Sequence, residues 1–382
     1  YYIEYQYQKK IESIKLNWTS GVVYEYVNAK SKLFQGNNFR ENVALFTQLD
    51  KKIGERINLS AGARYEQFSL KTGQYYLLED GDSVNYIFDS KPVFRSGINY
   101  KLSNFTFLRS SFGQGYRFPS IAELFIETEV ANGIWVYENP SLKPEQGWSA
   151  ELAVKQLYKL GNLTGYIDLA LFQMEYKDMM EFSFGKWQPY SNGNLGIGFK
   201  SINIGDTQIA GAELSLAGSL KMDNSTLNFL GGYTYIDAKP KDPDNIYAYD
   251  NDGNELNFYN TSSIDSSDLF LKYRYEHVAK LDVEFIKGKN SFGLSARYNS
   301  FMKNVDAIFV SEGFSGIIPG IIESREALNK GDLILDFRYI YAINKNNTAS
   351  LIVNNLLNRE YQTRPANLMP PRTVSIKWGI KI

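Results

Sequence analysis

The chain has 382 residues with 41 basic and 42 acidic side chains, a balance that gives no net field to attract nucleic acid. It has no cysteine and one histidine, which excludes disulfide scaffolds and thiol nucleophiles and disfavours histidine-based metal sites and serine triads. Aromatic residues make up 15% of the chain although its mean hydropathy is −0.34. This combination is typical of transmembrane β-barrels, whose strands are apolar on one face only.

Alternation of apolar and polar residues is the dominant pattern and predicts β-strands. Between Ile57 and Glu66, and again between Val374 and Lys381, apolar or small side chains occupy every second position. The pattern predicts about fifteen strands, and no apolar run is long enough for a membrane-spanning helix. The predicted strands cover 2–8, 12–30, 39–50, 55–71, 91–102, 104–115, 147–158, 162–180, 199–220, 225–238, 268–287, 290–303, 331–343, 347–357 and 372–382.

Connections of two kinds alternate between these strands. The short ones are 9–11, 51–54, 103, 159–161, 221–224, 288–289 and 344–346. The long ones are 31–38, 72–90, 116–146, 181–198, 239–267, 304–330 and 358–371. This segregation predicts an all-β, antiparallel transmembrane barrel with short periplasmic turns and long extracellular loops, since a sandwich or propeller has no reason for it.

The polar face of the strands is expected to line the barrel interior. Its charged residues include Arg64, Glu66, Glu213, Asp282, Glu284, Asp336 and Arg338. A closed bacterial barrel has an even number of strands, and the predicted strands 2–8 and 372–382 run in the same direction. The count therefore predicts a partial barrel with earlier strands outside this chain, and pairing of these two strands would contradict that prediction.

Four motifs in order carry a resemblance to a known family. They are GQGYRFPSIAELF (Gly113–Phe125), NPSLKPEQGWSAE (Asn139–Glu151), NIGDTQIAGAELSL (Asn203–Leu216), and NNLLNREY (Asn354–Tyr361) followed by PPRT (Pro370–Thr373). Their sequence and spacing resemble the C-terminal part of TonB-dependent outer-membrane receptors. The resemblance covers nearly the whole chain.

This resemblance implies a barrel of about 22 strands with an N-terminal plug inside it. Residues 1–382 would then be the C-terminal part of one barrel domain, without the plug and without about seven strands. The implied protein is not an enzyme. It would bind a scarce siderophore-, vitamin-, glycan- or peptide-like nutrient in the Gram-negative outer membrane and import it with TonB-derived energy. A passive porin remains an alternative, as does a structural or adhesive barrel that partners a surface lipoprotein.

Aromatic side chains in the long connections are the main candidates for substrate contact, because their rings could stack on a flat chelate, a sugar or a peptide. The candidates are Trp135, Tyr137, Trp187, Tyr190, Tyr247, Tyr249, Tyr75, Tyr76 and Arg117. The alternative, that these rings pack loop against loop, stays open. For Arg117 the favoured role is pairing with Glu123, which would fix how the long loop leaves the rim.

Two segments of the long connections carry more specific hypotheses. Within Gly113–Glu151, the middle from Glu127 to Tyr137 is the best candidate for ligand selection. The absence of histidine between Pro119 and Asn139 argues against haem unless Tyr137 takes the place of a histidine ligand. The segment DNDGNE suggests a calcium site formed by Asp250, Asp252 and Glu255, as a minority hypothesis beside an ordinary Asp-Gly surface turn.

Overall fold

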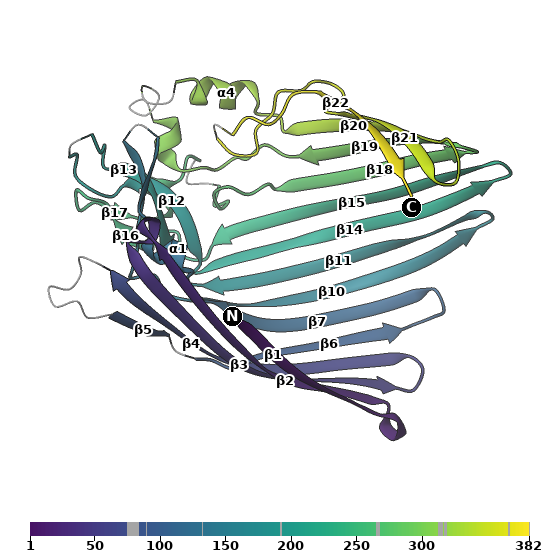
Figure 1. The fold of residues 1–382 in the computed structure, drawn as a ribbon, viewed down its shortest axis with the longest axis horizontal. Helices are drawn as coiled ribbons and strands as arrows, with labels where there is room; N and C mark the ends of the chain where they lie inside the picture. Colours follow the sequence, from purple (N-terminus) through teal and green to yellow (C-terminus); the bar gives the residue numbers. More distant parts are fainter. Residues whose placement is uncertain are drawn as a thin grey trace.

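The computed structural model is dominated by one long, curved antiparallel sheet (Figure 1). It describes residues 1–74, 84–88, 90–131, 133–191, 193–264, 268–311, 316, 319–365 and 367–381. Fifteen strands follow one another in chain order and form what we call the wall. They are β1 (Tyr2–Ile11), β2 (Leu16–Ser31), β3 (Gly36–Ile53), β4 (Ile57–Gln74), β6 (Val93–Lys101), β7 (Thr106–Arg117), β10 (Glu145–Leu160), β11 (Leu163–Lys177), β14 (Thr207–Met222), β15 (Ser225–Pro240), β18 (His277–Lys287), β19 (Asn290–Asn299), β20 (Asp332–Ala342), β21 (Asn347–Asn354) and β22 (Thr373–Ile380). The sixteenth strand, β5 (Val84–Phe88), pairs with β4 beside this path.

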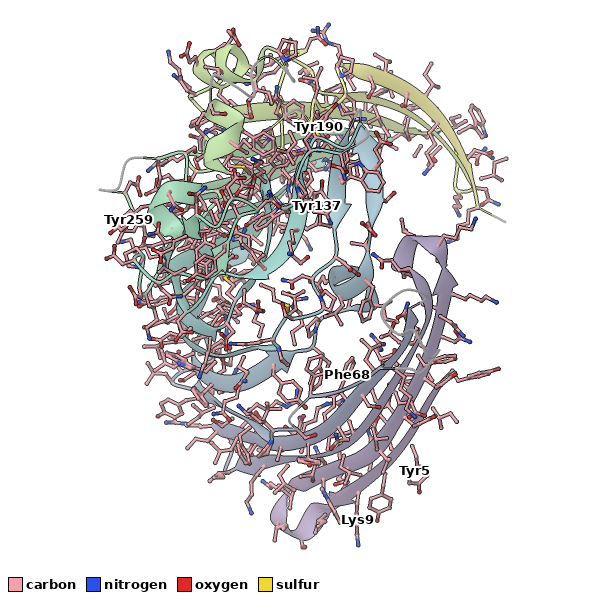
Figure 2. All side chains as sticks on the ribbon, turned by 90° about the vertical axis from the view of Figure 1, so that its left-hand side faces the viewer. Tyr5, Lys9, Phe68, Tyr137, Tyr190 and Tyr259 are labelled. Carbon is pink, nitrogen blue, oxygen red and sulfur yellow. The ribbon has the colours of Figure 1, made fainter. Side chains whose placement is uncertain are left out.

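The outer face of the wall is apolar and exposed. Register places Tyr5, Val22, Leu45 and Tyr65 side by side across the first four strands, with exposures of 43% to 69%. Tyr5 lies on the outside of the curved wall and Phe68 on the inside (Figure 2). An exposed apolar band that runs from strand to strand is what a lipid-facing surface requires, so the predicted one-sided strands are confirmed.

The inner face is charged, as predicted, and its charges are paired with one another within the sheet. Arg109 donates to Asp168 at 2.8 Å and to Glu151 at 3.0 Å, across three neighbouring strands. Farther along the same inner face, Arg338 of β20 donates to Asp282 of β18 at 2.6 Å. A Cβ atom on Gly293, in the strand between them, would overlap the Arg338 guanidinium. Glycine is therefore required there for the arginine to lie flat on the neighbouring strand.

The two rims of the wall differ as predicted, with one exception. The seven predicted short turns lie at one end and the predicted long connections lie at the other (Figure 1), but 31–38 proves to be short. Residues 31–38 were predicted as a long connection, but pairing of β2 with β3 continues to Ser31 and Gly36. The single-turn helix η2 (Lys32–Phe34) makes this a tight turn, with Gln35 in the left-handed region at φ 56°. The corresponding turn at the other rim contains η1 (Glu12–Ile14).

Two predicted strands were wrong in extent. The segment 199–220 was expected to be one strand, but the chain turns at Gly205, whose φ is +88°. It therefore divides into β13 (Ile197–Asn203), outside the wall, and β14 in the wall. The segment 268–287 enters the wall only at His277, because residues 268–276 are irregular and Tyr273 has a φ of 58°.

The long connections fold into a second body, the loop cap, made of the described residues of 118–144, 178–206, 241–276, 300–331 and 355–372. Its sheet contains β12 (Met180–Lys186), β13, β9 (Ile134–Tyr137) and β8 (Thr128–Ala131) in that order. The remaining elements are α1 (Ile121–Phe125), α2 (Phe258–Thr261), α4 (Ile321–Ala327), η3 (Ala307–Val310) and the pair β16 (Ala248–Tyr249) and β17 (Glu255–Leu256). Three buried apolar clusters lie in the cap or between it and the adjoining wall, so the long loops are packed rather than loose.

The wall does not close on itself within the described residues. Its order runs from β1 to β22 without a pairing between these two strands. Seen from the loop end, the two edges stand apart on one side of the arc (Figure 2). The pairing that would have contradicted a partial barrel is therefore not observed. Among the helices in the described part of the chain, none has the length and apolar character to cross a membrane.

Candidate functional site

The ends of the Gly113–Glu151 stretch fix the cap to the wall. Arg117 donates to Glu123 at 2.7 Å, as expected. Glu123 also accepts the Ser120 amide at 2.8 Å, which with the reciprocal bond forms a capping box at the start of α1. Glu145, the first residue of β10, accepts the amide of Met180 at 2.8 Å and so joins two loops. Arg117 thus has a structural role in the described contacts.

The middle of the same stretch is a hairpin of the cap sheet. Its two strands, β8 and β9, pair with each other, and β9 runs parallel to β13. Tyr137 is only 2% exposed and donates to Asn194 at 2.8 Å, whereas Trp135 is half-buried. This part of the predicted selectivity segment therefore supports the sheet and offers one ring, Trp135, for contact.

The other predicted aromatics differ widely in exposure. Tyr190 is 71% exposed and Tyr249 is 61% exposed, so both rings are available at the cap surface. Tyr247 is half-buried, and its hydroxyl contacts Thr261 and donates to the carbonyl of Asn257 at 3.0 Å. Tyr75 and Tyr76, the remaining two, lie outside the described residues. The structure thus brings some candidates to the surface and uses others for packing.

Trp187 lies beside a lysine that the sequence analysis did not single out. Its indole donates to the carbonyl of Gly198 at 3.0 Å, and the Lys200 ammonium lies 5.4 Å from the centre of its ring. Burial lowers the pKa of Lys200, and the opposing effect of the Glu138 carboxylate is smaller. A cation held over an indole offers both charge and a ring face to a ligand. The sequence analysis missed Lys200 because lysines are common in loops. Its approach to Trp187 depends on the pairing of β12 with β13, which the sequence does not show.

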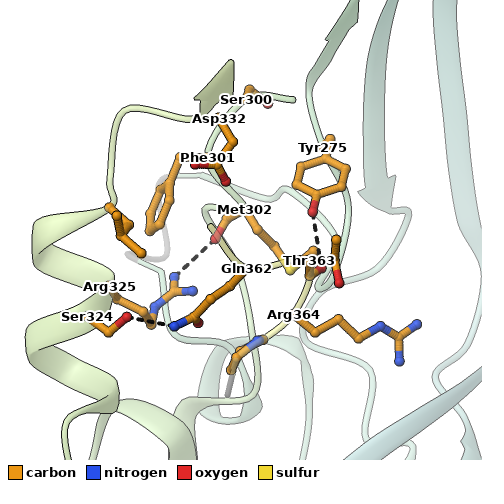
Figure 3. A pocket seen from close by; sticks show the side chains of 12 residues that line it. Tyr275, Ser300, Phe301, Met302, Ser324, Arg325, Asp332, Gln362, Thr363 and Arg364 are labelled. Atoms are coloured by element: carbon orange, nitrogen blue, oxygen red, sulfur yellow. Dashed lines mark hydrogen bonds between the residues drawn. The ribbon is translucent and has the colours of Figure 1, made fainter. Parts of the chain in front are cut away.

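A small cavity of about 40 Å³ lies between α4 and the last long connection (Figure 3). Arg325 lines it, with its guanidinium 4.8 Å from the Phe301 ring and bonded at 3.1 Å to the carbonyl of Met302. Gln362 donates to Ser324 at 2.8 Å and joins the loop to the helix. Burial lowers the pKa of Arg325. These contacts fix the two connections together and leave room for a few water molecules at most.

The most buried charges of the cap form a cluster of three residues from three loops. Lys272, at 2% exposure, lies 2.6 Å from Asp306 and 3.9 Å from Glu181. Burial alone would lower the pKa of Lys272, but the two carboxylates outweigh burial and raise it. Burial raises the pKa of Glu181, and it also raises that of Tyr273 beside Asp306. The sequence analysis missed this cluster, because its members are distant in the chain and lie among apolar residues.

The wall and cap can now be compared with known proteins. Residues 2–356 match the family model described as TonB dependent receptor-like, beta-barrel. The chain belongs to this family. It is accordingly an outer-membrane protein of the Gram-negative type, and the matched family consists of receptors and transporters rather than enzymes.

Solved structures of receptors share the fold at low sequence identity. The siderophore receptor PiuA from Acinetobacter baumannii has a TM-score of 0.66 and 15% identity over 99% of this chain and 55% of its own. For the Serratia marcescens hemophore receptor HasR, solved with its hemophore HasA and heme, the values are 0.64, 15%, 99% and 58%. The copper transporter OprC gives 0.64, 16%, 99% and 55%. The chain thus spans little more than half the length of these proteins.

The predicted calcium ligands make other contacts in the structure. Asp250 accepts the amides of Asp252 and Asn254, both at 2.8 Å, in an Asx-type turn. Asp252 forms a 2.6 Å ion pair with Lys186. Within the described residues, no three acidic, histidine or cysteine side chains are grouped so as to hold a metal. The contacts therefore do not support the calcium site, which stays a prediction to be tested by calorimetric titration.

Proposed function

We propose that this protein is a receptor that binds a scarce nutrient at its loop cap and imports it across the outer membrane with TonB-derived energy. The observation that carries this proposal is the cap itself, in which long loops from the extracellular rim pack into one body with its own sheet and buried clusters. A passive porin needs no such body, and loops of this length are most often functional.

The ligand we propose is a siderophore-, vitamin-, glycan- or peptide-like molecule with flat or ring-shaped groups. Tyr190 and Tyr249 expose their rings at the cap surface, and Trp187 carries the ammonium of Lys200 above its own ring. Such amphipathic faces bind planar groups through stacking and polar ones through hydrogen bonds. Receptors of similar fold include one for a siderophore and one for a hemophore with heme, which supports a ligand with flat or ring-shaped groups.

We also propose partners for the wall. A plug and further strands outside residues 1–382 would complete the barrel between β1 and β22, and the plug would contact the charged inner face. The open order of the described sheet and the paired inner charges of Arg109 and Arg338 support this arrangement. The TonB complex would act through the plug. A surface lipoprotein partner at the cap remains a second candidate.

Growth and uptake assays test the proposal. Deleting the gene should abolish energy-dependent growth on one nutrient of the proposed class, and the Tyr190→Ala and Tyr249→Ala variants should bind that nutrient more weakly. Phe105→Ala is the matched control, because Phe105 is an exposed aromatic residue of a short turn at the opposite rim. Uptake that persists without TonB energy would indicate a porin, and unchanged uptake after deletion would indicate a structural barrel.

A further inference from the structure

The buried cluster of the cap brings an amine and a carboxyl group into contact away from water. The Lys272 Nζ atom lies 2.6 Å from Asp306 Oδ1, and the two residues are 2% and 1% exposed. They belong to different long connections, 241–276 and 300–331, and are separated by 34 positions in the chain. The surrounding residues include Phe184 and Phe309, which belong to a buried apolar cluster. These surroundings keep bulk water away from the pair.

The second oxygen of Asp306 is held by two donors. Tyr273 donates its hydroxyl to Oδ2 at 2.6 Å, and the backbone amide of Phe184 donates to the same atom at 2.9 Å. Two fixed donors on one oxygen polarise the carboxyl carbon. They are also placed to stabilise negative charge on that oxygen if a nucleophile adds to the carbon.

A third titratable side chain lies next to the amine. Glu181 Oε2 is 3.9 Å from Lys272 Nζ, and the glutamate is 9% exposed. Ser183, on the same face of β12, accepts a hydrogen bond from Nζ at 3.2 Å. Burial raises the pKa of Glu181, so its carboxyl group takes up a proton more readily than an exposed one. A carboxyl group in this position can carry a proton from one atom of the pair to the other.

We propose that Lys272 and Asp306 form an intramolecular isopeptide bond, with Glu181 as the proton carrier. A proton first passes from the ammonium to Oδ1 within the 2.6 Å contact, which gives a neutral amine and a neutral acid. Nζ then bonds to Cγ, and Oδ2 takes the negative charge, stabilised by Tyr273 and Phe184. Glu181 accepts a proton from Nζ and returns it to Oδ1, which leaves as water while the Cγ–Oδ2 double bond re-forms. The products are one amide and one water molecule, without an oxidant or cofactor.

Such a bond would be a covalent cross-link between two loops of the cap. The chain has no cysteine, so disulfides cannot brace its extracellular loops. A link between residues 272 and 306 closes a ring that contains β18 and β19 and ties the two connections that flank them. This inference is independent of the transported nutrient, so it can fail while the proposed function holds.

Mass spectrometry of the receptor purified from outer membranes tests the proposal. The intact protein should be lighter than its sequence by one water molecule. A protease digest should contain a branched peptide that joins the segments around Lys272 and Asp306. An intact mass equal to that of the sequence, with both segments recovered as separate linear peptides, would overturn the proposal.

The chain provides its own matched control. Lys186 and Asp252 are also 2.6 Å apart, but their side chains are 43% and 50% exposed. This pair should remain unlinked in the same digest. The near-isosteric Glu181→Gln variant should fold, which heat-modifiable migration on gels would verify, and should show a large loss of the branched peptide. An undiminished yield of that peptide in folded Glu181→Gln protein would overturn the role given to Glu181.

Discussion

The wall and the loop cap solve the same problem, the burial of polar groups, in different ways. In the wall, each strand pairs with its neighbours, so the backbone N–H and C=O groups are hydrogen-bonded between strands. The side chains then differ only in whether they face the lipid or the barrel interior. In the cap, the strands are short, and side chains from distant loops satisfy one another. Periodicity therefore specifies the wall, whereas particular side-chain contacts specify the cap.

The ion pairs show this difference most clearly. Arg109 and Arg338 pair with carboxylates on an inner face that keeps them 38% and 29% exposed. Lys272 pairs with Asp306 where both side chains are at most 3% exposed. Removing one partner of an exposed pair leaves a solvated charge, but removing one partner of the buried pair leaves a charge without water. The same substitution should thus have unequal effects in the two regions.

The largest expected effect is that of Lys272→Met. It leaves the carboxyl groups of Asp306 and Glu181 buried without the lysine that contacts them, also preventing the proposed bond, and should destabilise the cap by about 3–5 kcal/mol or more. Native-state proteolysis of the cap measures this loss. The control is Lys186→Met, which breaks an exposed ion pair and should cost about 0–1 kcal/mol. Equal costs for the two variants would show that the cap does not depend on its buried pair.

The wall is tested next by placing charge on its two faces. Leu169 of β11 is 43% exposed on the outer face, so Leu169→Arg should cost about 2–4 kcal/mol if this position lies near the middle of the bilayer. Glu213 lies on the inner face of neighbouring β14, beside Ala170 in the register, so Glu213→Arg should cost little. Urea unfolding in lipid vesicles compares the variants, and the reverse order would mean that the two faces have been exchanged.

A smaller effect is expected on the pH dependence of the cap. Burial raises the pKa of Glu181 above its ordinary value of 4.5, so the folded cap binds this proton more tightly than the unfolded chain. The resulting stability is fully present below pH 4.5 and is lost as the pH rises through the raised pKa. Proteolysis across this range should therefore show a smaller decline for Glu181→Gln than for the parent protein. Parallel curves would contradict the assignment.

The smallest predicted effect concerns the capping box of α1. Ser120→Ala removes the hydroxyl that accepts the Glu123 amide and should cost the cap about 1 kcal/mol. Hydrogen exchange at the amides of α1 measures this local loss. Ser141→Ala is a suitable comparison, because its hydroxyl bonds Asn139 in an exposed turn of the same loop. A larger effect at Ser141 would contradict the structural role given to the α1 cap.

The sequence predicted the wall well, because alternation and loop length are local signals. It failed where tertiary contacts override them, as at Gly205 and Tyr273, where the chain leaves the strand direction. In the cap, the pairing of Arg117 with Glu123 was predictable from a short segment. The contact between Lys272 and Asp306 was not predictable, because it depends on which long loops pack against each other. A pattern along the sequence does not show which loops are in contact.

Cysteine labelling on intact cells tests the central claim most directly, because the chain has no cysteine of its own. A membrane-impermeant maleimide should label Tyr190→Cys and Tyr249→Cys, both exposed in the cap, without disruption of the outer membrane. It should label Asp223→Cys and Lys345→Cys, in short turns at the other rim, only after permeabilisation. Labelling of the turn variants on intact cells, with the cap variants protected, would contradict the orientation on which the proposed receptor function rests.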